Sequence, residues 1–318
     1  MQVFVRFGAQ AVLKLSIVIC TKDRSALLRR LLSSLEVDIG AQSDDLEILV
    51  VASGCEDDTA SVAASFLERL PLRIVVEPLP GLSKARNTAL TNTKSEAILW
   101  LDDDTEVFPG LISAYIRALD QYPEATYYAG RILPRIEGTP PSWVQYVIQN
   151  QPSTYSLLDL GNDERLLDAS LNEFPFGANM LVRRSVVEGF RFREDLGRNH
   201  DPGNLVGGEE TELFQMLSAG GHHGVWIPGA AVLHLIPKSR QTFRYYATYQ
   251  YAVGIIGVRL LNQKTTPFAW ALYPQFLFLI LSGRLLFKPE TWVRVVTKLQ
   301  RERGRVAEAK TNKKTGSV

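Results

Sequence analysis

One stretch of the sequence runs from apolar residues straight into three carboxylates, Ala97-Ile-Leu-Trp-Leu-Asp-Asp-Asp-Thr-Glu106. A short apolar run is typical of a buried strand, so Asp102, Asp103 and Asp104 should follow its C-terminal end. Ligands bind at that edge in open α/β sheets. Adjacent carboxylates repel one another, and a divalent cation that bridges to a diphosphate would offset the repulsion. Taken alone, the stretch is equally consistent with a solvated acidic turn that binds no ligand.

Three apolar runs precede this stretch, and helical patterns separate them. The runs predict strands over 15–20, 46–51 and 72–76, and the patterns predict helices over 25–35, 59–70 and 83–92. Strands that alternate with helices predict βαβ units, an α/β fold with a mostly parallel sheet flanked by helices. Right-handed crossovers place the loops around Thr21, Ser53 and Asp104 at one edge of that sheet. We expect Ser25 to cap the first helix.

The rest of the first 240 residues is less regular. The sequence predicts a helix over 109–122, strands over 129–133 and 176–182, and a helix that starts near Glu209 and Glu210. A long segment broken by prolines, residues 134–173, carries Trp143 and other aromatic residues. Such a connection is more often a binding segment than filler, so Trp143 is a candidate for the acceptor pocket.

Composition limits the class of protein. At 318 residues the chain can form one large domain with an appendage, and we expect a catalytic domain over 1–240 and a helical segment over 241–318. The 35 Lys and Arg nearly balance the 34 Asp and Glu, which gives no indication of a nucleic-acid partner. Cys20 and Cys55 follow no metal or disulfide spacing and suit a reducing compartment.

Several motifs occur in an order that is specific when they are taken together. They are Ser16-Ile-Val-Ile-Cys-Thr21, Val50-Val-Ala-Ser-Gly-Cys-Glu-Asp-Asp-Thr59, Gly81-Leu-Ser-Lys-Ala-Arg-Asn87, Leu101-Asp-Asp-Asp104, Phe176-Gly-Ala-Asn-Met180 and Gly208-Glu-Glu-Thr-Glu-Leu213. With them the chain resembles the inverting family 2 glycosyltransferases of the GT-A fold, from about residue 16 to residue 259.

The resemblance implies a nucleotide-sugar donor bound across the first four loops. It implies that Asp104 and Asp102 hold Mg²⁺ or Mn²⁺ on the diphosphate, while the inner acid faces the ribose. The strand that ends at His234 suggests a third ligand, with a structural histidine as the alternative. The resemblance assigns the donor site to Thr21, Asp23, Arg24, Ser53, Lys84, Arg86, Asp102 and Asp103.

The resemblance also implies a base and an acceptor pocket. Glu210 matches the family's catalytic base, with the neighbouring Glu209 as its rival. Gly177 and Asn179 match the loop that shapes the sugar and acceptor pocket. Asp57 matches the aspartate of the second loop, for which we favour a helix-capping role at Thr59.

One departure from the family pattern concerns the nucleotide. The second loop often begins with an aspartate that recognises the base, and Ala52 stands here, followed by Ser53. A UDP-sugar remains the first choice, with GDP- and dTDP-sugars open.

The tail changes in character. Residues 265–283 are uncharged and rich in aromatic and aliphatic side chains, and Pro274 interrupts them. Many Lys and Arg follow, and a basic cluster beside an apolar segment attracts anionic lipid. We favour a segment in the membrane interface, which would make the protein cytoplasmic and peripheral at the inner face of the cell membrane. A helical hairpin packed on the catalytic domain is the alternative.

The function expected from these features is metal-dependent, inverting transfer of a sugar from a nucleotide sugar to a hydroxyl of a glycan or lipid-linked acceptor. A non-catalytic sugar-nucleotide-binding module on the same fold and a nucleotidyltransferase are the alternatives. The latter would have a glycine-rich loop after the first strand, where Thr21-Lys-Asp-Arg24 contains no glycine.

Overall fold

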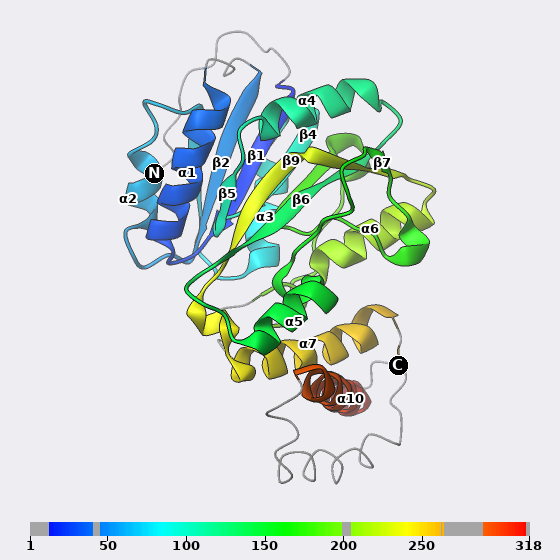
Figure 1. The fold of residues 1–318 in the computed structure, drawn as a ribbon. Helices are drawn as coiled ribbons and strands as arrows, with labels where there is room; N and C mark the ends of the chain where they lie inside the picture. The colour runs from blue at the N-terminus through cyan, green and yellow to red at the C-terminus, as the bar shows by residue number, and fades with distance from the viewer. Residues whose placement is uncertain (1–12, 41–44, 199–204, 262, 264–288, 316–318) are drawn as a thin grey trace. The chain divides into compact units, whose positions relative to one another are not determined.

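The computed structural model describes residues 13–40, 45–198, 205–261, 263 and 289–315 (Figure 1). The apolar stretch 265–283 therefore lies outside the described residues. The chain divides into two compact units. Unit 1 falls within Met1–Arg135, Ser156–Asp195 and Glu209–Leu235, and unit 2 within Ile136–Tyr155, Leu196–Gly208 and Ile236–Val318.

Unit 1 contains most of the mixed sheet, whose strands run in the order β3-β2-β1-β4-β8-β6-β9-β5, with β7 beside β9. The strands are β1 Leu15–Thr21, β2 Leu46–Ser53, β3 Leu72–Glu77, β4 Ala97–Asp102, β5 Thr105–Val107, β6 Tyr127–Ile136, β7 Arg165–Leu166, β8 Asn179–Arg183 and β9 Gly224–Ile236. The first four strands are parallel, and β8 joins β4 in the antiparallel direction. The expected α/β fold is confirmed, and its parallel half carries the predicted ligand edge.

Helices cover the sheet because its strands are apolar on both faces (Figure 1). The helices of unit 1 are α1 Ser25–Ile39, α2 Thr59–Ala64, α3 Leu82–Asn92, α4 Leu111–Gln121 and α6 Glu209–Ala219. Helices α3 and α6 share one core cluster with alternate residues of the central strands, among them Val18, Ile98 and Trp100. The neighbours Ile17 and Leu99 are equally buried and point to the opposite face.

Several boundaries differ from the expectations, and three of them concern the segments around the site. Ser25 is the first residue of α1 rather than its cap, and its backbone N–H donates to Asp57 Oδ2 at 3.4 Å. Helix α2 ends at Ala64, because the N–H groups of Phe66, Leu67 and Arg69 bond to carbonyls three residues back and form tighter turns. Strand β8 starts at Asn179, since the preceding residues 177 and 178 form a turn.

Unit 2 contains the helices α5 Ser142–Asn150, α7 Phe243–Leu261 and α10 Pro289–Thr315. The described residues of 136–155 and 196–208 belong to this unit, whereas the sequence predicted one catalytic domain over 1–240. Trp143 of α5 explains the first assignment, because its ring packs 5.9 Å from Tyr246 and 5.0 Å from Trp292. Such non-local packing leaves no trace in the local sequence.

Helices α7 and α10 pack closely on each other. A Cβ atom at Gly254 would overlap the carbonyl oxygen of Arg301, and one at Gly304 would overlap that of Tyr251. Arg259 Nε also lies 2.9 Å from Glu308 Oε1. This part of the tail has the close packing of a helical pair. In the described part of the chain, every helix is too short or too polar to span a membrane.

Candidate active site

The acid triplet lies where the sequence predicted it, at the C-terminal end of β4. Cys20 of β1 pairs with Asp102 in register, so the first loop and the triplet share one edge of the sheet. Strand β5 then pairs antiparallel with β9, with Thr105 opposite His234. This pairing brings His234 to the triplet from a distant part of the sequence, with its Nε2 3.1 Å from Asp104 Oδ1.

Asp102, Asp104 and His234 form a group that fits a divalent cation. One ligand atom from each residue lies within 4.8 Å of the others. Asp104 and His234 are buried, so few waters compete for their polar atoms. Carboxylate oxygens suit Mg²⁺ and Mn²⁺, and the imidazole of histidine is a common metal ligand in proteins. The donor set therefore matches the predicted metal site.

Asp103 belongs to a second set of contacts. Thr21 Oγ1 donates to Asp103 Oδ2 at 2.8 Å, and Arg24 Nη1 donates to Asp103 Oδ1 at 2.7 Å. Arg24 Nη1 also lies 3.3 Å from Asp104 Oδ2. Burial raises the pKa of Asp103 to about 6, against the lowering effect of Arg24. Thr21 and Arg24 thus order the acid triplet, and their direct contact with the donor stays a prediction.

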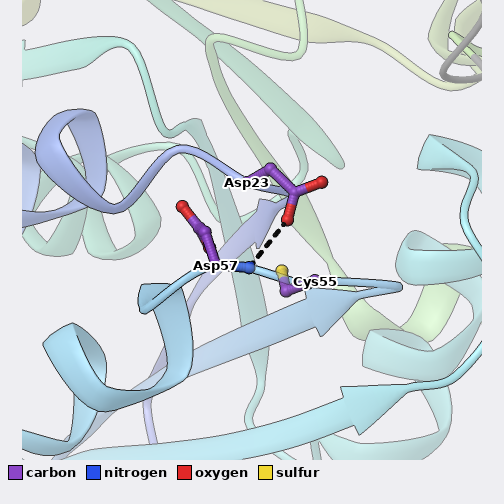
Figure 2. Close-up of side chains that lie close together, drawn as sticks. All are labelled: Asp23, Cys55 and Asp57. Atoms are coloured by element: carbon purple, nitrogen blue, oxygen red, sulfur yellow. Dashed lines mark hydrogen bonds between the residues drawn. The ribbon is translucent and has the colours of Figure 1, made fainter.

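The second loop is held by carboxylates from two sides (Figure 2). Asp23 has a positive φ of 49° and its Oδ1 accepts from the backbone N–H groups of Glu56 at 2.7 Å and Asp57 at 3.3 Å. Asp57 lies one residue before Asp58, the N-cap of α2, and accepts from the Thr59 N–H at 2.9 Å, so it satisfies a backbone donor at the start of the helix. Cys55 lies close to both acids, and one ligand atom from each of the three residues lies within 4.8 Å of the others (Figure 2). Both carboxylates are engaged by the loop itself.

Ser53 and Lys84 lie on neighbouring segments of the same edge. Ser53 is buried at the end of β2, and its hydroxyl donates to the carbonyl of Leu79 at 3.0 Å. Lys84 lies half-buried in the first turn of α3. Their contacts with a nucleotide stay predictions.

Arg86 and the two glutamates form a buried charged group. Arg86 Nη1 lies 2.5 Å from Glu209 Oε1 and 3.7 Å from Glu210 Oε2. The side chains of Arg86 and Glu209 are 3% and 2% exposed, whereas that of Glu210 is 18% exposed. Burial raises the pKa of Glu209 to about 8, and Glu210 adds to the rise while Arg86 opposes it. One cation therefore faces two carboxylates in a place that water hardly reaches.

The arginine is electrostatically linked to the metal group. Asp102 contributes to the raised pKa of Arg86 alongside Glu209 and Glu210, although burial opposes the rise. Burial raises the pKa of the Cys20 thiol to about 12, and the charges of Arg86, Asp102 and Glu209 all act on it. The two acidic groups thus lie within electrostatic reach of the same two side chains, Arg86 and Cys20.

The remaining predicted residues have structural partners. A Cβ atom at Gly177 would overlap Arg86 Nη2. Asn179 is completely buried, and its amide accepts from Tyr115 Oη at 2.8 Å and donates to the Ala230 carbonyl at 2.9 Å. Trp143 belongs to the aromatic cluster of unit 2. Contacts of these three residues with a sugar or acceptor stay predictions.

Sequence reasoning missed Phe192. The ring centroid lies 5.5 Å from Arg86 Cζ, and the Phe192 backbone exchanges two hydrogen bonds with the Asn87 side chain. The one indication in the sequence is that Asn87, the partner of Phe192, follows Arg86 in the motif Gly81–Asn87. No local pattern around Phe192 indicates this contact.

Comparisons with known proteins point to one family. Residues 16–190 match the sequence model of glycosyl transferase family 2. The chain is 23% identical to succinoglycan biosynthesis protein ExoM of Rhizobium meliloti (strain 1021) over 256 residues, which are 79% of this chain and 76% of that protein. It is 27% identical over 111 residues to the GalNAc(5)-diNAcBac-PP-undecaprenol beta-1,3-glucosyltransferase of Campylobacter jejuni, which are 34% of this chain and 35% of that protein.

Two solved structures share the fold. A mannosyltransferase from Pyrobaculum calidifontis, in complex with GDP-Man and Mn²⁺, matches with a TM-score of 0.61 at 15% identity, over 94% of this chain and 88% of that one. TarS 1–349 of S. aureus matches with a TM-score of 0.53 at 14% identity, over 95% and 92% of the two chains. The GT-A-type fold is thereby confirmed. Since the family match covers more than half of the sequence and includes the acid triplet and Arg86, this chain belongs to glycosyl transferase family 2 and is a glycosyltransferase.

Proposed function

We propose that the protein transfers a sugar from a nucleotide diphosphate sugar, with UDP-sugar favoured, to a hydroxyl group, with inversion and with a divalent cation. The observation that carries the proposal is the pairing of two acidic groups in one site. Asp102, Asp104 and His234 form one group, and Glu210 with its partners forms the other. Arg86 and Cys20 interact electrostatically with both.

The first group would hold the cation. Bound Mg²⁺ or Mn²⁺ supplies positive charge where the leaving diphosphate gains negative charge. Arg24 is 40% exposed and pairs with Asp103 and Asp104, so it lies at the opening of this group. We expect its guanidinium to assist in orienting a diphosphate there.

The second group would activate the acceptor. In a single inverting displacement, a carboxylate takes the proton of the attacking hydroxyl as the new bond forms. Glu210 is the partly exposed member of the pair in the first turn of α6, whereas Glu209 is buried against Arg86. The helix N-terminus favours a negative charge there. We therefore assign the base to Glu210.

The names of the relatives guide the choice of acceptor. One relative is named for succinoglycan biosynthesis and the other for glucosyl transfer to an undecaprenol-linked glycan. A growing glycan, carried on a lipid, is the acceptor class that we propose here. The protein would then work in polysaccharide or glycolipid biosynthesis at the inner face of the cell membrane, where the basic residues of the tail would contact anionic lipid.

A donor panel tests the proposed function. Binding of UDP-, GDP- and dTDP-sugars is measured by calorimetry with Mn²⁺, with Mg²⁺ and with excess EDTA. The expected result is binding of one nucleotide class that depends on the cation. Donors that bind are then offered to lipid-linked acceptors, and NMR of the product gives the anomeric configuration. Retention of configuration, or full donor binding in EDTA, would contradict the proposal.

Vesicle sedimentation tests the membrane contact. Full-length protein should bind anionic vesicles at low salt and release them as salt rises, because salt screens the lysine and arginine charges. If the protein does not bind such vesicles at low salt, the membrane contact is refuted, and packing within unit 2 is the only role left for the tail helix.

A further inference from the structure

We propose that Arg86 is a positioning residue for the catalytic base, that it acts through Glu209 and Glu210 at the start of α6, and that Gly177 provides the space for its guanidinium. This inference rests on the proposed function, because it takes Glu210 as the catalytic base and assigns Arg86 to that base rather than to the donor. The resemblance to the family implied instead that Arg86 contacts the nucleotide.

The direction of the Arg86 side chain carries the first step. Its Nη1 lies 2.5 Å from Glu209 Oε1 and 3.7 Å from Glu210 Oε2. The side chain is 3% exposed, so its charge is directed into the protein. An arginine that gripped a diphosphate would present its guanidinium to the opening, as the 40% exposed Arg24 does.

The surroundings of Arg86 hold it in that direction. The Cζ atom lies 5.9 Å from the Trp100 ring centroid and 5.5 Å from the Phe192 ring centroid. Phe192 is fixed by Asn87, whose side chain accepts from the Phe192 N–H at 2.7 Å and donates to its carbonyl at 2.9 Å. Aromatic rings near a guanidinium stabilise its charge and restrict its position.

Gly177 completes the arrangement. A Cβ atom at this position would overlap Arg86 Nη2. The backbone of Gly177 is not in the left-handed region, so conformation alone does not require glycine there. The space for the guanidinium is the physical reason for a residue without a side chain.

Arg86 also affects the protonation of the two glutamates. Three groups outside α6 take part in this charge balance. Arg86 of α3 acts on the carboxylates, and Cys20 of β1 and Asp102 of β4 act on Arg86. Arg86 is the cation among them, and removal of a nearby cation disfavours an ionised carboxylate. Loss of Arg86 should therefore both release Glu210 from its position and move the acidic limb of the pH–rate profile to higher pH.

The experiment compares donor affinity with turnover. UDP, GDP and dTDP with Mn²⁺ serve as affinity probes, and turnover is release of the nucleotide diphosphate from the matching sugar nucleotide. The test variants are Arg86→Met, Arg86→Lys and Gly177→Ala. The control variants are Arg69→Met, which removes an arginine paired with Glu36 at 2.7 Å over the Phe66 ring, and Gly229→Ala, whose new methyl group would have an ordinary contact with Ala114.

The expected result is a split between the two measurements. Arg86→Met and Gly177→Ala should keep the probe affinity within about twofold, because neither side chain reaches the donor, while turnover falls by about 10²-fold through misplacement of the base. Their acidic limbs should shift to higher pH, and Arg86→Lys should restore part of both. Both controls should behave as wild type.

Three further variants keep the test decisive: Arg86→Met/Glu209→Gln, Glu210→Gln and Arg86→Met/Glu210→Gln. Arg86→Met leaves the buried Glu209 and the partly exposed Glu210 without their cation, so folding is measured by circular dichroism. Arg86→Met/Glu209→Gln removes the cation and the buried carboxyl group together. Arg86→Met should add little to Glu210→Gln, because both act through one group. Loss of probe affinity with unchanged turnover in Arg86→Met would overturn the inference in favour of a nucleotide contact. If Glu210→Gln keeps full turnover, the proposed base fails, whereas an inactive Glu210→Gln beside a fully active Arg86→Met refutes the positioning role alone.

Discussion

His234 Nε2 lies 3.1 Å from Asp104 Oδ1, and both side chains are buried at the same edge of the sheet. The pairing of β5 with β9 creates this contact, since it places Thr105 directly opposite His234. A histidine that contacts an acid in this way can either neutralise it or share a cation with it. The proximity of Asp102 favours the shared cation.

The metal group should respond to single substitutions. Asp104→Asn and His234→Gln keep the approximate shapes of the side chains but each weakens one ligand. We expect the affinity for Mn²⁺ in the presence of the nucleotide diphosphate to fall by at least about 10-fold, an effect that even outer partners of metal ligands produce. Manganese paramagnetic resonance measures this affinity directly. Asp120→Asn is the control, because Asp120 pairs with Lys14 on the surface.

Activity in chelator gives the complementary measurement. Turnover should disappear in excess EDTA and return with added Mn²⁺ or Mg²⁺. An enzyme that turns over fully in EDTA would exclude the metal role of all three residues.

The packing of α7 on α10 leads to a prediction with a definite sign. Alanine has the higher helix propensity, so Gly304→Ala should stabilise α10 by up to about 1 kcal/mol if the helix were isolated. The new methyl group would instead overlap the Tyr251 carbonyl. We therefore expect a loss of about 1–3 kcal/mol in the free energy of unfolding, the usual effect of overpacking, measured by urea denaturation. Arg303→Ala, at the exposed neighbouring position, should change it little.

The sequence predicted those parts of the molecule that have a local pattern. Strands such as Ala97–Asp102 are apolar runs, and the acids after them follow from the parallel order. The role of Asp103 was less accessible, because Thr21 and Arg24 reach it from the end of the neighbouring strand β1, far away in the sequence. The partners of Trp143 lie far away in the sequence, and no periodicity reports such contacts. Reasoning by motif identified Glu209 and Arg86 but could not reveal that they touch each other.

The buried Glu209 should make stability depend on pH. Burial, with Glu210, raises its pKa in the folded protein from 4.5 to about 8, so the folded state binds more protons than the unfolded state between these values. Stability from this group is fully present below about pH 4.5 and is lost as pH rises to about 8. The slope is at most about 1.4 kcal/mol per pH unit.

Glu209→Gln removes this dependence. Compared with wild type, the variant should gain stability progressively between pH 5 and pH 8, as measured by urea unfolding at each pH. Glu212→Gln removes a carboxylate from the same turn of α6, one that pairs with Arg193 at 3.0 Å near the surface, and serves as the control. A constant difference between wild type and Glu209→Gln over this range would show that Glu209 does not retain its proton.

The base assignment leads to the sharpest contrast between two neighbouring residues. Glu210 is 18% exposed and lies 3.7 Å from Arg86, whereas Glu209 is 2% exposed and lies 2.5 Å from it. An acceptor hydroxyl must come within about 3 Å of the base, so the more accessible carboxylate is the better placed. Glu210→Gln should keep donor binding but lower the transfer rate by about 10²-fold or more, the usual loss for a general base. Glu209→Gln should lower it less, because that residue acts through its contact with Arg86.

Donor affinity by calorimetry and single-turnover transfer rates separate the two effects. If Glu209→Gln is inactive while Glu210→Gln transfers at the wild-type rate, the roles within the pair are reversed. If both variants keep full activity, the base lies elsewhere in the site.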